Sequence, residues 1–307
     1  MRLLANAKIN LSLDVTGIRD DGYHEVSMIM QSVDLADILD IEKSEGDSII
    51  LTCDNNDLPC DEHNLVMRAA RALMDAADRH DGLSIHLTKN IPMAAGLAGG
   101  SADAAAALVG INELCGFGLS VDELKQIGGR IGADIPFCIQ GGTCLAEGIG
   151  EILTPVSPLP DCCIVMVKPP FDVSTAYVYK NLDPLLTGDI FHPDTHRMIS
   201  LIEAGDIPDI AHDLGNILEA VTVAGYPEIS DIKNRLMDCG AAGSLMSGSG
   251  PTVYGIFTDE PAAMNACADL KGISADIGQS ASEYGRTVYE SVFMCRPVSS
   301  GIVIQQR

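Results

Sequence analysis

The sequence predicts an α+β protein, in which strands, hairpins and helices are mixed rather than strictly alternating along the chain. Several short runs place apolar residues at every second position, as half-buried strands do, and others place them at helical spacing. Turn-rich segments join some of the expected strands directly, which is typical of hairpins. A strict alternation of strands and helices would instead favour a doubly wound parallel sheet.

Length and charge limit the possible functions. The chain has 307 residues, 47% of them apolar, and can bury a substantial core as two ordinary domains or one large one. Its formal net charge of −24 argues against nucleic acid and anionic membranes as partners, because both repel an acidic surface. No apolar run approaches the roughly 18 residues of a membrane helix. The sequence starts with a strand pattern rather than a targeting peptide, so we expect a cytoplasmic protein and leave its oligomeric state open.

The first strand is expected at residues 3–13, where apolar residues occupy the odd positions. Side chains two positions apart on a strand point the same way, so Lys8 and Asn10 share one face. A lysine in such a strand either lies at a solvent-exposed edge or turns toward a carboxylate or phosphate. We expect Lys8 to pair with Asp134.

The other elements before residue 155 follow from the same periods and from start and stop signals. Ser120 and Glu123 form a capping box that opens a helix. In chain order we expect strands at 38–43 and 48–53 with a turn at 45–47, a helix over 62–77, a strand at 83–89, a helix over 102–114, the capped helix from 120 to 128–129 or 132, and a hairpin of 143–147 with 151–155.

The proline-rich segment Pro155–Pro160 is the expected domain boundary, which divides the chain into residues 1–155 and 156–307. Glycine stop signals and apolar runs predict the elements beyond it. These are strands at 162–167, 244–247, 252–257 and 287–294, and helices over 174–181, 227–239 and 261–270.

The segment P-M-A-A-G-L-A-G-G-S-A-D-A at 92–104 joins the strand at 83–89 to the helix at 102–114. Its glycines at positions 96, 99 and 100 let the backbone turn tightly and let N–H groups approach a ligand. Ser101 is expected to cap the helix. The free amides and the positive end of the helix dipole favour an anion there, although small residues could also serve packing alone. The segment matches neither of the two best-known phosphate-loop patterns.

Five segments, taken together, resemble the GHMP kinase family, which includes galactokinase, homoserine kinase and mevalonate kinase. The glycine segment resembles the family's P-x-x-x-G-L-x-S-S-x-A, and the agreement in order and spacing runs from about Leu4 to Phe257. The other segments are A-N-A-K-I-N-L-S-L-D-V-T-G at 5–17, D-G-Y-H-E at 21–25, I-G-A-D-I-P-F at 131–137 and S-G-S-G-P-T-V-Y-G at 247–255.

The resemblance implies a two-lobed fold with the active site in the cleft between the lobes. It implies an ATP-dependent kinase, with Mg²⁺, that phosphorylates a hydroxyl of a cytidine diphosphate sugar alcohol in non-mevalonate isoprenoid precursor synthesis. The segment D-G-Y-H-E favours this branch of the family, because it serves a nucleobase. The expected partners, ATP and the cytidine diphosphate sugar alcohol, are both small molecules. The resemblance nominates the following residues for ATP binding: Pro92, Met93, Ala94, Ala95, Gly96, Leu97, Ala98, Gly99, Gly100, Ser101 and Ala102.

The resemblance also assigns roles to residues outside the glycine segment. Asp134 matches the family's catalytic aspartate and Lys8 is its expected partner, while Asn10 would bond the reacting end of the substrate. Tyr23 would stack on cytosine, and His24 would hydrogen-bond its edge. The match of V-S-T-A-Y-V-Y at 173–179 nominates Tyr177 for the other face of the base, although Tyr177 could equally pack in a helix core. No residue is nominated as a direct metal ligand.

Two other functions fit the same residues, namely another small-molecule kinase of the family and a catalytically silent nucleotide or metabolite sensor. Retention of Lys8, Asp134 and the glycines argues against the sensor. The chain departs from the family pattern at Asn6, Ala98 and Ala102. Ala98 replaces a glycine without strain only if its φ is negative.

Overall fold

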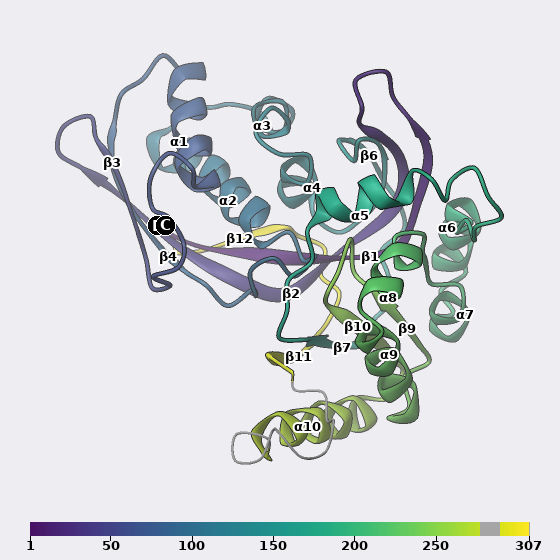
Figure 1. The fold of residues 1–307 in the computed structure, drawn as a ribbon. Helices are drawn as coiled ribbons and strands as arrows, with labels where there is room; N and C mark the ends of the chain where they lie inside the picture. The colour runs from purple at the N-terminus through teal and green to yellow at the C-terminus, as the bar shows by residue number, and fades with distance from the viewer. Residues whose placement is uncertain (277–288, 307) are drawn as a thin grey trace.

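The computed structural model describes residues 1–276 and 289–306, and it confirms the α+β class. Within these residues the strands form two sheets, one of eight strands and one of four (Figure 1). The larger sheet contains β1 (Arg2–Ile18), β2 (His24–Ser44), β3 (Ile49–Cys53), β4 (Gly82–Thr88), β5 (Thr143–Gly148), β6 (Ile152–Pro155), β8 (Gly215–Asn216) and β12 (Ile302–Gln306). Its main order is β12-β1-β2-β4-β3, and the remaining strands attach beside this path.

The long strands β1 and β2 pair antiparallel along most of their length. The predicted alternation on β1 is confirmed, since Ile9 and Leu11 are buried in the core. The polar face of β1 is covered too, with Lys8 5% exposed and Asn10 fully buried. Polar side chains on a strand buried on both faces need specific partners, because burial without a hydrogen bond is costly.

Four helices of the first half lie on one side of the larger sheet (Figure 1). They are α1 (Leu65–Ala76), α2 (Gly99–Cys115), α3 (Val121–Gly129) and α4 (Ile135–Gln140). Helix α2 packs against β1, β2 and α1. All its residues from Ala102 to Leu108 are buried, because alanine side chains allow close approach on every face.

The capping box predicted for α3 is confirmed, with Ser120 and Glu123 each accepting a hydrogen bond from the other's backbone. The helix ends at Gly129, one of the predicted positions. Helix α1 begins after Asn64, whose side chain accepts from Val66 N–H. Helix α4 was not among the expected elements, although the proline in its first turn is a helix-start signal.

The strands expected at 38–43 and 48–53 are joined by a turn, as a hairpin would be. Strands β2 and β3 are nevertheless not neighbours in the sheet. Strand β4 lies between them and pairs antiparallel with β2 and parallel with β3. The reason is the connection from β3 through α1 to β4, since a helical crossover returns the chain to a parallel strand. The hairpin of β5 with β6 is confirmed.

The smaller sheet has the order β11-β7-β10-β9, and its strands are β7 (Cys163–Lys168), β9 (Gly243–Met246), β10 (Val253–Phe257) and β11 (Ser291–Cys295). The second half also contains α5 (Thr175–Leu182), α6 (Thr195–Ala204), α7 (Ile207–His212), α8 (Glu219–Gly225), α9 (Glu228–Asp238) and α10 (Glu260–Asp276). The predicted strand at 287–294 corresponds to β11, and its first two positions lie outside the described residues. Helices α6, α7 and α8 were not predicted.

The division at residue 155 stays a prediction, but two elements from beyond it join the larger sheet. Strand β12 pairs with β1 at Arg2–Ala5, and β8 pairs with β1 at Ser12–Leu13. Both chain ends therefore lie side by side (Figure 1). Across the described ranges, no helix has both the length and the apolar character to cross a membrane.

Candidate active site

A cavity of about 1110 Å³ is lined by residues from both halves of the chain. The first half contributes Lys8, parts of the segments 22–28 and 58–65, and the glycine segment 92–101. The second half contributes one face of α5 and the turn around Gly248. Residues that the sequence analysis nominated from separate motifs therefore share one cavity wall.

The glycine segment approaches the cavity through backbone conformations that differ from the expected ones. Helix α2 begins at Gly99, and the preceding residue Ala98 has φ +57°. Gly96 has φ +75°, and a Cβ on it would lie 2.2 Å from the Ser247 carbonyl oxygen. Gly96 is therefore required both for its conformation and for the close approach of the turn that contains Ser247. The amides at the start of α2 have no partners within the helix and can meet an anion.

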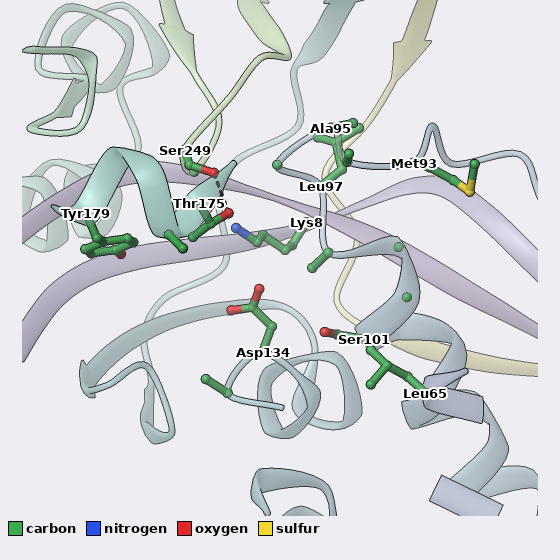
Figure 2. Close-up of a pocket in the computed structure, with 18 of the residues that line it drawn as sticks. Lys8, Leu65, Met93, Ala95, Leu97, Ser101, Asp134, Thr175, Tyr179 and Ser249 are labelled. Carbon is green, nitrogen blue, oxygen red and sulfur yellow. Dashed lines mark hydrogen bonds between the residues drawn. The ribbon is translucent and has the colours of Figure 1, made fainter. Parts of the chain in front are cut away.

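The expectation that Ser101 caps this helix is wrong, because the left-handed Ala98 starts the helix earlier and leaves Ser101 inside the first turn. The cap residue Ala98 makes no side-chain hydrogen bond. Ser101 still lines the cavity, on the same side as Asp134 (Figure 2). Ala102, nominated with the ATP residues, is fully buried and lies outside the cavity wall.

The positive φ of Ala98 also shows that alanine is not a strain-free replacement for glycine here. Ala94 shares this conformation, with φ +48°. A left-handed conformation costs an L-residue about 1–2 kcal/mol. The segment therefore keeps its shape only if its surroundings hold it.

Lys8 and Asn10 face the same way, as predicted, and the Lys8 ammonium donates a 2.7 Å hydrogen bond to Asn10 Oδ1. Asn10 Nδ2 lies 3.3 Å from Met28 Sδ, and Asn10 is absent from the cavity wall. The role predicted for Asn10, direct contact with the reacting end of the substrate, does not fit this burial. Asn10 instead orients Lys8.

Asp134 lies at the N-terminus of α4 but forms no capping hydrogen bond there. Its carboxylate points into the cavity and faces Lys8 from the opposite wall (Figure 2). Among the described residues the expected direct ion pair of Lys8 with Asp134 is not formed, and the Lys8 ammonium bonds Asn10 instead. An acceptor group placed between the two would meet one positive and one negative side chain.

Aromatic side chains line one end of the cavity. Tyr23 is 60% exposed at the cavity rim, and the rings of His24 and Tyr179 lie 4.8 Å apart. His24 Nε2 lies 2.6 Å from Asp183 Oδ1. Burial, and secondly the nearby Asp134 carboxylate, raise the pKa of Tyr179, so its phenol remains neutral.

The structure places Tyr179, not Tyr177, in this wall. Tyr177 is 52% exposed and outside the cavity, because residues two apart on a helix point to different sides. Thr175 and Tyr179 are one turn apart and both line the cavity. Tyr179 belongs to the same segment V-S-T-A-Y-V-Y at 173–179, and its helical spacing from Thr175 was the available signal.

The turn at 247–252 covers the cavity from above Lys8. Ser247 Oγ donates to the Gly96 carbonyl at 3.0 Å, and Ser249 Oγ lies 2.8 Å from Thr175 Oγ1. Asn216 holds this turn in place, because its Nδ2 donates to the carbonyls of Met246 at 2.9 Å and Gly248 at 2.8 Å. The turn joins the strands expected at 244–247 and 252–257, whereas Asn216 was not among the expected site residues.

Known proteins share both the fold and the motifs. The sequence-family model for the GHMP kinases N terminal domain matches residues 64–142. The family model for the GHMP kinases C terminal domain matches residues 198–272. The 4-diphosphocytidyl-2-C-methyl-D-erythritol kinase of Clostridium botulinum (strain Eklund 17B / Type B) is 48% identical over 277 residues, covering 90% of this chain and 98% of the relative. The chain belongs to the 4-diphosphocytidyl-2-C-methyl-D-erythritol kinase family, within the GHMP kinases.

Other members of this kinase family give the same result. The kinase of the same name from Caldicellulosiruptor saccharolyticus is 49% identical, covering 88% of this chain and 93% of the relative. A crystal structure of 4-(cytidine 5'-diphospho)-2C-methyl-D-erythritol kinase has a TM-score of 0.78 at 30% identity, covering 97% of this chain and 99% of that one. A homoserine kinase from Cytophaga hutchinsonii, at 21% identity and a TM-score of 0.73, shares the fold.

This kinase also contains site residues that the sequence analysis did not nominate. Lys89, Asp103 and Asn64 also line the cavity, and Asn64 is the residue that precedes α1. Asp103 lies within the segment 92–104 and Lys89 lies just before it, and this position was the available signal.

Proposed function

We propose that this kinase transfers the γ-phosphoryl group of ATP to the 2-hydroxyl of 4-diphosphocytidyl-2-C-methyl-D-erythritol, in non-mevalonate isoprenoid synthesis. The observation that carries the proposal is the placement of Asp134 opposite Lys8, between the aromatic end of the cavity and the glycine segment (Figure 2). A hydroxyl between these two side chains lies where an acceptor must lie for in-line attack. The active site is then the cavity between the two halves of the chain.

The triphosphate would lie on the first amides of α2. These amides and the helix dipole attract an anion, and the dipole alone contributes about 0.3–2 kcal/mol. The overall charge of −24 opposes this binding, so local positive groups must outweigh it. Lys8 and Lys180 provide positive charge in the cavity wall.

The acceptor hydroxyl would bond the Asp134 carboxylate. In phosphoryl transfer, most catalysis comes from positioning and charge compensation, so Asp134 either orients the hydroxyl or accepts its proton. The nearby Lys8 ammonium, held by Asn10, compensates negative charge that develops on the transferred group.

The cytosine would bind among Tyr23, His24 and Tyr179. The two tyrosines offer ring faces for stacking, and the histidine offers a donor or acceptor for the edge of the base. This arrangement replaces the predicted pair of Tyr23 with Tyr177.

Mg²⁺ would accompany ATP. In the part of the chain that the structure describes, no three His, Cys, Asp or Glu side chains gather as a metal site, so the protein does not offer a preformed cage. Mg²⁺ in nucleotide enzymes keeps water and phosphate oxygens and needs only one or two protein oxygens. Asp134 and the Ser101 hydroxyl, on one side of the cavity, fit that requirement. The bound ion would neutralise charge on the phosphates.

The decisive test measures ADP release from purified protein with ATP, Mg²⁺ and each candidate acceptor. We expect release with 4-diphosphocytidyl-2-C-methyl-D-erythritol and loss of release when Mg²⁺ is chelated. Release with homoserine or mevalonate instead would exclude this substrate. A shift in melting temperature on ligand addition without any ADP release would favour a sensor.

Tyr179→Ala is expected to raise KM for the cytidyl substrate about 5–150-fold, because stacking on one base contributes about 1–3 kcal/mol. KM for ATP should stay within about twofold, since the glycine segment is untouched. Steady-state kinetics with each substrate varied in turn measures both. Tyr177→Ala is the matched control on the same helix, and an equal effect of both variants would contradict the assignment.

A further inference from the structure

A buried charged cluster lies where three segments around the glycine segment meet. Lys89 Nζ donates to Asp103 Oδ2 at 2.7 Å and also to Asp37 Oδ2. The side chains of Lys89, Asp37 and Asp103 are 7%, 0% and 3% exposed. We call these residues the Asp37–Lys89–Asp103 cluster. None of the motifs that identified the family contains Asp37 or Lys89.

Asp37 fixes the entry to the glycine segment. Its Oδ1 accepts hydrogen bonds from the backbone N–H of Asn90 at 2.6 Å and of Ile91 at 2.8 Å. Asn90 Nδ2 also donates to the Ala36 carbonyl at 2.8 Å. The chain immediately before Pro92 is therefore bound to β2 through both backbone and side-chain contacts.

Asp103 fixes the exit, because it lies in α2 shortly after the free amides at the helix start. A Cβ on Gly99, the first residue of that helix, would lie 3.3 Å from Lys89 Nζ. One ammonium group thus connects the strand before the glycine segment to the helix after it. The two ends of the glycine segment are therefore held at a fixed distance from each other.

The cluster is a costly way to provide stability alone. Asp103 Oδ1 is buried and has no hydrogen-bond partner among the described residues, and burial raises the pKa of this carboxyl. Apolar residues of similar volume often replace buried ion pairs without loss of stability. Between the two anchored ends, Ala94 and Ala98 hold left-handed conformations. Such conformations persist only where the surroundings determine them.

We propose that the Asp37–Lys89–Asp103 cluster is a positioning device that holds the glycine segment in its strained form, with the first amides of α2 directed at the nucleotide phosphates. The proposal rests on the proposed role of that segment in binding ATP. Lys89 acts here through the backbone that it anchors, and its removal should weaken nucleotide binding even where the fold survives.

The central variant is Lys89→Met/Asp103→Asn. It removes one positive and one negative charge together, so the net charge of the cluster is unchanged and a simple Coulomb effect on the anion is excluded. We expect the Kd for ADP, measured by calorimetry, to rise about tenfold or more. In the ligand-free protein, amide hydrogen exchange within residues 94–101 should accelerate about tenfold. A Kd within about twofold of wild type would overturn the proposal.

Lys168→Met is the matched control for loss of a buried lysine. Lys168 is 2% exposed and bonds Glu290 at 2.6 Å and Asp172 at 3.2 Å, outside the cavity wall. Both partners keep access to water, so this variant should fold. We expect lower thermal stability with unchanged ADP affinity. Equal weakening of ADP binding in both variants would mean that Lys89 contributes only general stability.

A double-mutant cycle with Ala98→Gly tests the link to backbone strain. Glycine adopts the left-handed conformation freely, so it should restore ADP affinity by about threefold or more in the cluster variant, and change it less than about twofold in wild type. Equal effects in both backgrounds would reject the proposed coupling. A wild-type protein that fails to bind ADP would refute the proposed function instead, while the exchange measurement still reports on the cluster.

Discussion

Asp134→Asn is expected to lower kcat by about 10²–10⁴-fold, the usual contribution of a general acid–base group. The amide keeps the shape of the side chain but removes the negative charge that would orient the acceptor hydroxyl or take its proton. Because Asp134 forms no capping hydrogen bond, the fold should tolerate the change. Steady-state kinetics with both substrates saturating measures the effect.

The control experiment measures the thermal stability and the ADP affinity of the Asp134→Asn variant. We expect the melting temperature and the Kd for ADP to stay close to wild type, since α2 and its amides are unaltered. Turnover within a few-fold of wild type would remove Asp134 from the mechanism. It would leave Lys8 and the glycine segment as the main catalytic features.

Gly96→Ala is expected to destabilise the protein by about 2–4 kcal/mol and to raise KM for ATP at least about tenfold. The added Cβ would lie 2.2 Å from the Ser247 carbonyl oxygen and 3.0 Å from the Gly250 carbonyl oxygen. Both atoms belong to backbone, so neither can move aside without displacing the turn over Lys8. Denaturant unfolding and ATP-dependent kinetics measure the two effects.

Gly100→Ala is the matched stability control. A Cβ on Gly100 would meet Leu65 Cδ1 at 3.5 Å, an ordinary contact, and the residue lies within α2. Alanine is favoured over glycine by about 1 kcal/mol in a helix, so this variant should be at least as stable as wild type. Equal destabilisation by both variants would show that the effect of Gly96→Ala does not come from its clash with the turn at 247–252.

Much of the fold could be predicted because local signals decided it. The alternation on β1, the strand before the glycine segment and the capping box of α3 each depend on a few neighbouring residues. The pairing of β3 with β4 could not be predicted, because it depends on the path of α1 between them. Short helices such as α7 and α8 carry too few periods to stand out.

The candidate site shows the same limit at the level of single side chains. Periodicity placed Lys8 and Asn10 on one face but could not reveal that only Lys8 reaches the cavity. The start of α2 depends on the positive φ of Ala98, which an alanine does not signal. Tyr177 and Tyr179 lie in the same short helix, and only the direction in which each side chain points separates them. Each of these differences arises from a backbone conformation or from the direction of a side chain, rather than from residue type.

The pairing of β12 with β1 bears on how the chain acquires activity during synthesis. Asn6 lies close to Lys8, and it donates from its backbone to the Gly301 carbonyl at 2.9 Å and from Nδ2 to the Ser300 carbonyl at 2.8 Å. On the ribosome, the strand that bears Lys8 must wait for residues near 300 to emerge before its sheet neighbours are complete. A nascent chain would thus remain catalytically silent until the residues near 300 are in place.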